Sequence, residues 1–232
     1  MPLRKKHDSR FLFLQGTVAA QIHFIGFIAA FFGLYFLIKL SSNNPDPKHY
    51  WGNLIYLFTA MLVFGTSSLY HFLKEGFYIS DRTKDWFEDL DHFSIYLFIA
   101  GTYTPFLINV VAEPWQTRIL ILVWIIAIIG IFYTYYRPRL PRWAQSRLVY
   151  TGLFLLMGWT ISIRISEILE KLSAVETSFL LMGAMCYTVG AVIYALKKPN
   201  LFPGIFGFHE LWHVAVLLGA LFHYFLIYQF YM

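Results

Sequence analysis

The sequence predicts an all-α integral membrane protein, a bundle of seven transmembrane helices with its N-terminus in the cytoplasm and its C-terminus outside. Three observations predict it: the composition, the number of apolar runs and the distribution of Lys and Arg. Of the 232 residues, 58% are hydrophobic and 13% are charged, and that charged share is about half the usual one for a soluble domain. Such a chain cannot cover a soluble surface with polar groups, so a lipid bilayer is its expected solvent.

Seven apolar runs follow one another along the chain, and each is long enough for one crossing at about 20 residues per span. We expect the spans at roughly 18–40, 51–73, 89–111, 115–136, 147–167, 174–196 and 206–231. The segments between them, such as 43–47, 74–88 and 137–142, carry prolines or charges and are expected to be connectors. Residues 18–232 should therefore form a single transmembrane domain that follows a basic cytoplasmic segment, 1–17.

The basic residues Arg4, Lys5 and Lys6 precede the first apolar run, as they do in a secretory signal peptide. The run at 18–40 is too long for the apolar core of such a peptide, and no small-residue cleavage site is evident. We therefore expect this run to be retained as the first span. The many aromatic residues, 20% of the chain, are expected on lipid-facing surfaces and in interfacial belts.

The Lys and Arg residues are divided unevenly between the two ends of the predicted spans. With the N-terminus in the cytoplasm, 13 of the 18 fall on the cytoplasmic side. The positive-inside rule favours this orientation, and an odd number of spans then places the C-terminus outside. The net charge of +5 is thus explained by topology, so we expect membrane lipids and no nucleic acid as partners. The sequence indicates no soluble partner and no particular oligomeric state.

Ionisable residues inside membrane spans are costly, and each is therefore a candidate for function. On the predicted topology, His71 lies near the end of the second span, Asp91 opens the third, and His209 and His213 open the seventh. Three separate segments thus place His or Asp at one depth, near the cytoplasmic side. The orientation comes from Lys and Arg alone, so this agreement supports it independently.

The spacing of these histidines is typical of a metal site. His209 and His213 are four residues apart and share one face of a helix, as do Ser67 and His71. Three neutral imidazoles bind zinc at about 2.0–2.1 Å and leave one position for water. A lone histidine near a helix end is more often solvated or hydrogen-bonded in the core. The convergence of His71, His209 and His213 with Asp91 at one depth favours a functional site over isolated solvated histidines, and the pair His209 and His213 can bind one zinc ion.

Other histidines have weaker claims to this site. His23 lies near the cytoplasmic end of the first span and is placed to reach the same cavity. His92 lies about 100° around the helix from Asp91, so both line the site only if the third span is deep in the bundle. His223 is ten residues past His213, about 15 Å along the helix axis, and is expected to be a hydrogen-bonded core residue.

The stretch 209–213, His-Glu-Leu-Trp-His, also satisfies the zincin pattern H-E-x-x-H, in which the glutamate is a general base. Taken alone, it predicts an intramembrane metalloprotease with Glu210 as the base. The pattern is short, and such a protease also needs a third ligand and a place to unwind a substrate helix.

A wider set of motifs resembles the hemolysin III family of bacterial membrane proteins, part of the progestin and adipoQ receptor group that includes the adiponectin receptors. The residues that carry the resemblance are Ser67-x-x-x-His71, Leu90-Asp91-His92, the stretch Ala-Gly-Thr-Tyr-Thr-Pro-Phe at 100–106, His209-x-x-x-His213, the segment 17–26 with His23, and Asn-Leu-Phe-Pro-Gly at 200–204. The resemblance covers nearly the whole chain and is far more specific than H-E-x-x-H.

The resemblance implies a seven-helix bundle in a bacterial inner (plasma) membrane, with zinc near the cytoplasmic leaflet. By motif, the three histidines would be ligands, Asp91 would hold or activate a zinc-bound water, and Ser67 would stand close beside them. His23, His92 and Glu210 would be neighbours of the ligands. Because the wider group does not require a glutamate at position 210, the protease interpretation is weakened.

The function expected from these features is zinc-dependent hydrolysis of a membrane lipid amide or ester, ceramidase-like by family analogy, in membrane lipid homeostasis. The alternative is a receptor-like protein or a sensor of membrane state without enzymatic activity, in which zinc is a structural clamp. Lesser alternatives are a cytolysin, as the family label suggests, and the metalloprotease. The sequence shows no amphipathic segment for insertion that would support a cytolysin.

Overall fold

The structure, a computed structural model, describes residues 9–42, 44–76 and 80–232. This part of the chain is almost entirely helical, and it contains seven helical segments long and apolar enough to cross a membrane. They are Thr17–Ser41, Pro47–Lys74, Asp81–Val110, Trp115–Arg139, Arg147–Lys171, Ala174–Leu196 and Phe208–Gln229. The prediction of an all-α protein with seven spans is confirmed.

The helices differ from the predicted runs mainly at their ends. The α-helices are α1 (Ser9–Ser41), α2 (Pro47–Gly76), α3 (Asp81–Val110), α4 (Trp115–Tyr136), α5 (Arg147–Gly158), α6 (Ile165–Lys171), α7 (Ala174–Leu196) and α8 (Phe208–Gln229). Two 3₁₀ segments, Arg137–Arg139 and Trp159–Arg164, follow α4 and α5. The fifth span is thus α5, a 3₁₀ turn and α6 in series. Helix α1 already begins within the segment expected to precede the first span.

The connector expected at 74–88 is largely helical. Helix α3 begins at Asp81, eight residues before the predicted run, because the Ser80 side chain accepts a hydrogen bond from the Thr83 backbone N–H and caps the helix. Hydropathy detects the apolar part of a helix, whereas a helix continues into polar sequence wherever its end is capped. Helix α7 begins in the same way, with a capping box between Ser173 and Glu176.

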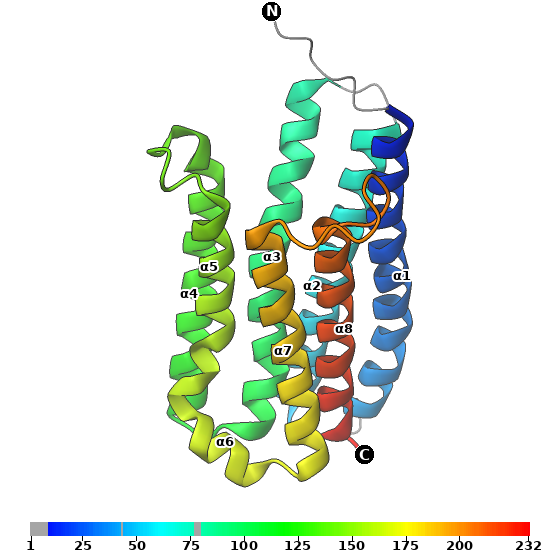
Figure 1. Ribbon diagram of the computed structural model, residues 1–232. Coiled ribbons are helices and arrows are strands. Elements are labelled where there is room, and N and C mark those ends of the chain that lie inside the picture. The colour runs from blue at the N-terminus through cyan, green and yellow to red at the C-terminus, as the bar shows by residue number, and fades with distance from the viewer. Residues whose placement is uncertain (1–8, 43, 77–79) are drawn as a thin grey trace, which may run out of the picture.

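The spans alternate in direction, so α1 begins at one end of the bundle and α8 finishes at the other (Figure 1). The end where α1 begins is termed the N-terminal end below. Helix α2 ends and helix α3 begins at this end, where the connections α4–α5 and α7–α8 also lie (Figure 1). Helix α1 ends and α2 begins at the opposite end, together with the connections α3–α4 and α6–α7. The placement of the N-terminal end in the cytoplasm stays a prediction.

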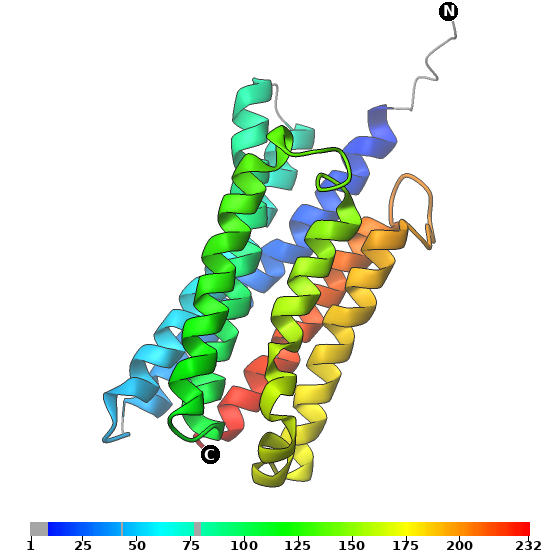
Figure 2. The same cartoon turned by 90° about the vertical axis from the view of Figure 1, so that its left-hand side faces the viewer.

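The seven spans form a ring. Each packs against its neighbour in the chain, α5 packs against α7, and α8 returns to pack against α1. Figure 2 shows α5 and α7 side by side, next to α4. The outer surface keeps large apolar side chains exposed, among them Phe32 at 60% and Ile129 at 61%. A soluble protein rarely exposes so much contiguous apolar surface, whereas lipid is a suitable solvent for it.

A candidate metal centre in an apolar cavity

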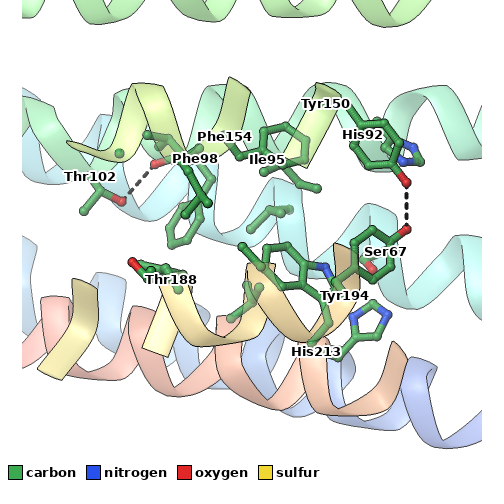
Figure 3. Close-up of a pocket in the computed structure, with 18 of the residues that line it drawn as sticks. Ser67, His92, Ile95, Phe98, Thr102, Tyr150, Phe154, Thr188, Tyr194 and His213 are labelled. Carbon is green, nitrogen blue, oxygen red and sulfur yellow. Dashed lines mark hydrogen bonds between the residues drawn. The ribbon is translucent and has the colours of Figure 1, made fainter. Parts of the chain in front are cut away.

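A cavity of about 760 Å³ lies inside the ring and is lined by residues from α1, α2, α3, α5, α7 and α8. Polar side chains, including Ser67, His92 and His213, gather toward its N-terminal end. Apolar side chains such as Ile95 and Phe98 line the next stretch (Figure 3). The cavity therefore combines a polar end, where chemistry is possible, with a long apolar part that suits a hydrocarbon chain.

Three histidines converge at the polar end. His71 lies in the last turns of α2, and His209 and His213 lie in the first two turns of α8. The Nε2 atoms of His209 and His71 are 3.3 Å apart, and those of His213 and His209 are 3.0 Å apart. One ligand atom from each histidine lies within 4.8 Å of the other two. The structure thus brings together the three predicted ligands in a group that can hold a metal ion.

The spacing of these atoms fits a single ion. Ligand nitrogens placed tetrahedrally at about 2.0–2.1 Å from zinc are roughly 3.3 Å apart. Hydrogen bonds between imidazoles give similar distances, but a ring nitrogen of a neutral imidazole has either one proton or one lone pair. The Nε2 atom of His209 has two other Nε2 atoms as close neighbours, and it cannot form a full hydrogen bond to both. One cation at the centre satisfies all three.

His23 supports the ligand group from α1. Its Nε2 atom is 2.9 Å from the Nδ1 atom of His213, and both residues are buried. A partner on the second ring nitrogen fixes the orientation and the tautomer of a metal-binding histidine. The structure therefore places His23 against His213, one of the predicted ligands, and in the cavity that its sequence position suggested.

Asp91 and Ser67 line the same cavity as the histidines. The Ser67 hydroxyl faces the Asp91 carboxylate, yet it makes no hydrogen bond within 3.5 Å among the described residues. Ser94 donates to the backbone carbonyl of Asp91 at 2.6 Å and accepts from Thr66 of α2 at 3.0 Å. These contacts tie this part of α3 to α2 and leave the Asp91 carboxylate beside the cavity. Asp91 does not open the third span as expected, because α3 already begins at Asp81.

His92 and Glu210 also line the cavity, but one polar atom of each is engaged within its own helix or at the helix start. The Nδ1 atom of His92 lies 2.7 Å from the backbone carbonyl of Glu88, one turn earlier in α3. The Oε2 atom of Glu210 accepts the backbone N–H of Gly207 at 2.7 Å, and Glu210 is fully buried. Glu210 therefore caps the start of α8, which accounts for its presence without a role as general base.

Two tyrosines of the cavity were not foreseen. The hydroxyls of Tyr150 (α5) and Tyr194 (α7) are 3.1 Å apart and bridge these helices (Figure 3). The Tyr194 ring lies 5.9 Å from that of His209 and stacks on Trp212, with the Arg147 guanidinium 4.3 Å from its centroid. The expectation that aromatic residues face lipid is wrong for these two. Nothing in their spacing distinguishes them from the lipid-facing tyrosines.

Comparison with known proteins agrees with this architecture. The family described as Haemolysin-III related matches residues 11–224. The Hemolysin-3 homolog of Bacillus subtilis (strain 168) is 30% identical over 201 residues, which cover 87% of each chain. Hemolysin-3 of Bacillus cereus is 31% identical over 209 residues, 90% of this chain and 88% of that protein. Heptahelical transmembrane protein 3 of Arabidopsis thaliana is 32% identical over 198 residues, 79% of this chain and 55% of that protein.

Proposed function

The chain belongs to the Haemolysin-III related family, and from this premise we propose that it is a zinc-dependent hydrolase of a membrane lipid amide or ester. It is a multi-pass protein of a bacterial plasma membrane, so its substrates are at hand in the surrounding bilayer. The observation that carries the proposal is the convergence of three histidine Nε2 atoms at the polar end of an apolar cavity. Three imidazole ligands leave a position open, which is the pattern of catalytic zinc sites.

A zinc ion held by the three histidines would supply a Lewis acid and a nucleophilic water at neutral pH. The chain's own contribution begins with Asp91. An ionised carboxylate only accepts hydrogen bonds, so Asp91 is suited to take a proton from the attacking water and return it to the leaving group. Ser67, whose hydroxyl faces Asp91, would donate a hydrogen bond that orients this carboxylate.

The cavity suits the chain of a lipid. Its volume of about 760 Å³ lies in the range of natural ligand pockets. Its basic residues, Lys74, Arg137 and Arg147, lie where their spans reach the N-terminal end of the bundle. A lipid would therefore place its head group near these cations, its amide or ester at the histidines and its hydrocarbon along Ile95 and Phe98.

One observation favours the alternative of a structural metal in a sensor without enzymatic activity. Helices α2 and α8 are not neighbours in the ring of described helices, yet His71 and His209 meet across its interior. A metal ion would clamp α2 to α8 at the N-terminal end, in addition to the hydrogen bond from the Tyr56 hydroxyl to the Ala220 carbonyl further along the two helices. We do not propose cytolytic activity, because the described spans close into a ring around this site. An intramembrane protease is not supported either, since Glu210 caps its own helix.

Asp91→Asn separates the hydrolase from the structural clamp. The substitution keeps the size of the side chain and removes its ability to accept a proton. We expect Asp91→Asn to retain the metal and to lower the turnover of a ceramide or ester by about 100-fold or more. The measurement is lipid hydrolysis by purified protein in lipid nanodiscs, with metal content determined on the same samples.

The matched control is Asp89→Asn, the same change two residues away at a position that does not line the cavity. Turnover by Asp89→Asn should equal that of the wild type. Hydrolysis by Asp91→Asn at the wild-type rate would contradict the proposed role of Asp91. A wild type that binds metal, loses thermal stability on chelation and hydrolyses neither lipid class would favour the structural clamp.

A further inference from the structure

A second polar zone of the cavity lies where α7 and α8 pack together. Tyr187 of α7 and His223 of α8 both line the cavity, and their ring centroids are 5.4 Å apart. His223 follows His213 by ten residues, which is about 15 Å along the axis of α8. This zone is therefore distinct from the histidine triad, although both border the same cavity.

Two glycines leave the space that these two rings occupy. A Cβ atom on Gly183 of α7 would lie 2.4 Å from the Nε2 atom of His223. A Cβ atom on Gly219 of α8 would lie 2.7 Å from the ring of Tyr187. Each helix thus presents a glycine to the polar ring of the other, and small residues permit this close approach between membrane helices. The position of both rings is consequently set by the backbone.

The polar atoms of both rings have fewer hydrogen-bond partners than buried polar atoms usually have. The Tyr187 hydroxyl and the two ring nitrogens of His223 are buried and make no hydrogen bond within 3.5 Å among the described residues. The backbone of Leu180 interacts with the His223 ring, and one carbonyl can serve only one of the two nitrogens. Buried polar groups in proteins are nearly always paired, so the unmet atoms at this cavity wall indicate a bound group.

Two threonine hydroxyls extend the polar zone to α3 and along α7. Thr102 donates to the carbonyl of Phe98 at 2.8 Å, and Thr188 donates to that of Ala184 at 2.8 Å while it accepts from the Trp159 indole N–H at 3.3 Å. A hydroxyl oxygen has two lone pairs, so both oxygens can still accept a further hydrogen bond. Figure 3 shows Thr102 and Thr188 at the end of the view opposite His213. The apolar part of the cavity therefore leads from one polar zone to another.

We propose that Tyr187 and His223 bind an uncharged hydroxyl or amide group on the chain of the lipid that occupies the cavity. A tyrosine hydroxyl and a neutral imidazole can each donate and accept a hydrogen bond, which suits a group that does both. The Lys and Arg residues that line the cavity belong to its N-terminal end, so this zone does not suit a carboxylate or phosphate. The inference rests on the proposed function, because the reacting end of the same lipid is expected at the triad.

The test compares two fatty acids that differ by one mid-chain hydroxyl. Stearate and 12-hydroxystearate compete with radiolabelled stearate for the purified full-length protein in detergent solution. If the mid-chain hydroxyl gains one net hydrogen bond, the wild type should bind 12-hydroxystearate roughly 3- to 10-fold more tightly than stearate. Tyr187→Phe and His223→Leu should each reduce this preference, and the double variant should abolish it while still binding stearate.

Two controls test whether the preference depends on this site and on the position of the hydroxyl. Tyr224→Phe makes the same change on a neighbouring tyrosine that does not line the cavity, and it should keep the full preference. In the wild type, 2-hydroxystearate, whose hydroxyl lies beside the head group, should bind like stearate. Tyr187→Phe removes a single oxygen, so it keeps the test informative if His223→Leu does not fold.

The outcomes separate this inference from the proposed function. Equal affinity of the wild type for stearate and 12-hydroxystearate overturns the second polar site and leaves the proposed hydrolase untouched. A preference that persists in the folded double variant also overturns it. Failure of the wild type to bind any of these fatty acids contradicts lipid occupancy of the cavity, and with it both proposals.

Discussion

Helices α2 and α3 and the last part of the chain contribute polar residues at both ends of the bundle, with Asp91 of α3 beside the histidines at the N-terminal end, yet the two ends present different chemistry. At the N-terminal end, α2 and α8 contribute His71, His209 and His213, whose Nε2 atoms face one another. At the opposite end, His49 of α2, Asn109 of α3 and Tyr231, just after α8, also meet. There the His49 Nδ1 atom and the Asn109 Nδ2 atom each lie 3.3 Å from the Tyr231 hydroxyl oxygen.

The two sets of polar side chains differ in their hydrogen-bonding partners. The Tyr231 hydroxyl can donate to His49 while accepting from Asn109, so its hydrogen bonds are complementary. A tyrosine hydroxyl is protonated at neutral pH, and burial raises the pKa of Tyr231 further, so this hydroxyl can act as the donor. None of the three lines the cavity. A histidine in a span therefore indicates a metal site only when a ring nitrogen without a hydrogen-bond partner of its own faces other atoms that can bind a metal.

Removing one histidine from each end should give opposite results, and this is the largest effect we expect. His213→Ala removes one of the three proposed ligands and the contact with His23. We expect it to lose stoichiometric metal and metal-dependent lipid turnover. The measurement is metal content and hydrolysis of ceramide or ester in the same reconstituted samples.

His49→Ala is the matched variant at the opposite end. It breaks one hydrogen bond to Tyr231, so we expect a loss of about 1 kcal/mol of stability, seen as a lower melting temperature, with unchanged metal content and turnover. Equal metal content in His213→Ala and His49→Ala would remove the distinction between the two ends.

A smaller effect is expected at His23, which contacts the proposed ligand His213 without being a proposed ligand itself. His23→Phe keeps a ring in the buried site and removes the partner of the His213 Nδ1 atom. Loss of such a partner typically lowers metal affinity by about 10- to 100-fold. Competition with a chelator of known affinity measures the change.

The control for His23→Phe is His92→Phe, since His92 lines the same cavity but its Nδ1 atom faces the Glu88 carbonyl of its own helix. We expect this variant to keep the wild-type metal affinity. An affinity loss in His92→Phe as large as that in His23→Phe would mean that His213 has no special support from α1.

Much of the fold and the metal-binding group followed from the sequence, because both depend on patterns that survive without tertiary information. Apolar runs of about 20 residues mark spans, and a four-residue spacing places His209 and His213 on one face. The break in the fifth span after Gly158 left no such mark, since the apolar run continues through the 3₁₀ segment.

Contacts between distant helices could not be predicted in the same way. The link between Tyr150 and Tyr194 depends on α5 lying beside α7, and hydropathy does not specify neighbours. His223 is expected from the sequence to be a hydrogen-bonded core residue. In the structure it lines the cavity, and its ring nitrogens make no hydrogen bond within 3.5 Å among the described residues. In both cases the chemistry depends on which neighbours the fold provides.

The central claim is that the three histidines hold a metal ion, and metal analysis of the purified protein tests it most directly. The wild type is compared with a His71→Ala, His209→Ala, His213→Ala triple variant by elemental mass spectrometry. We predict about one zinc per chain in the wild type and none above background in the variant. A folded wild type without a stoichiometric transition metal, before and after incubation with zinc, would contradict the account.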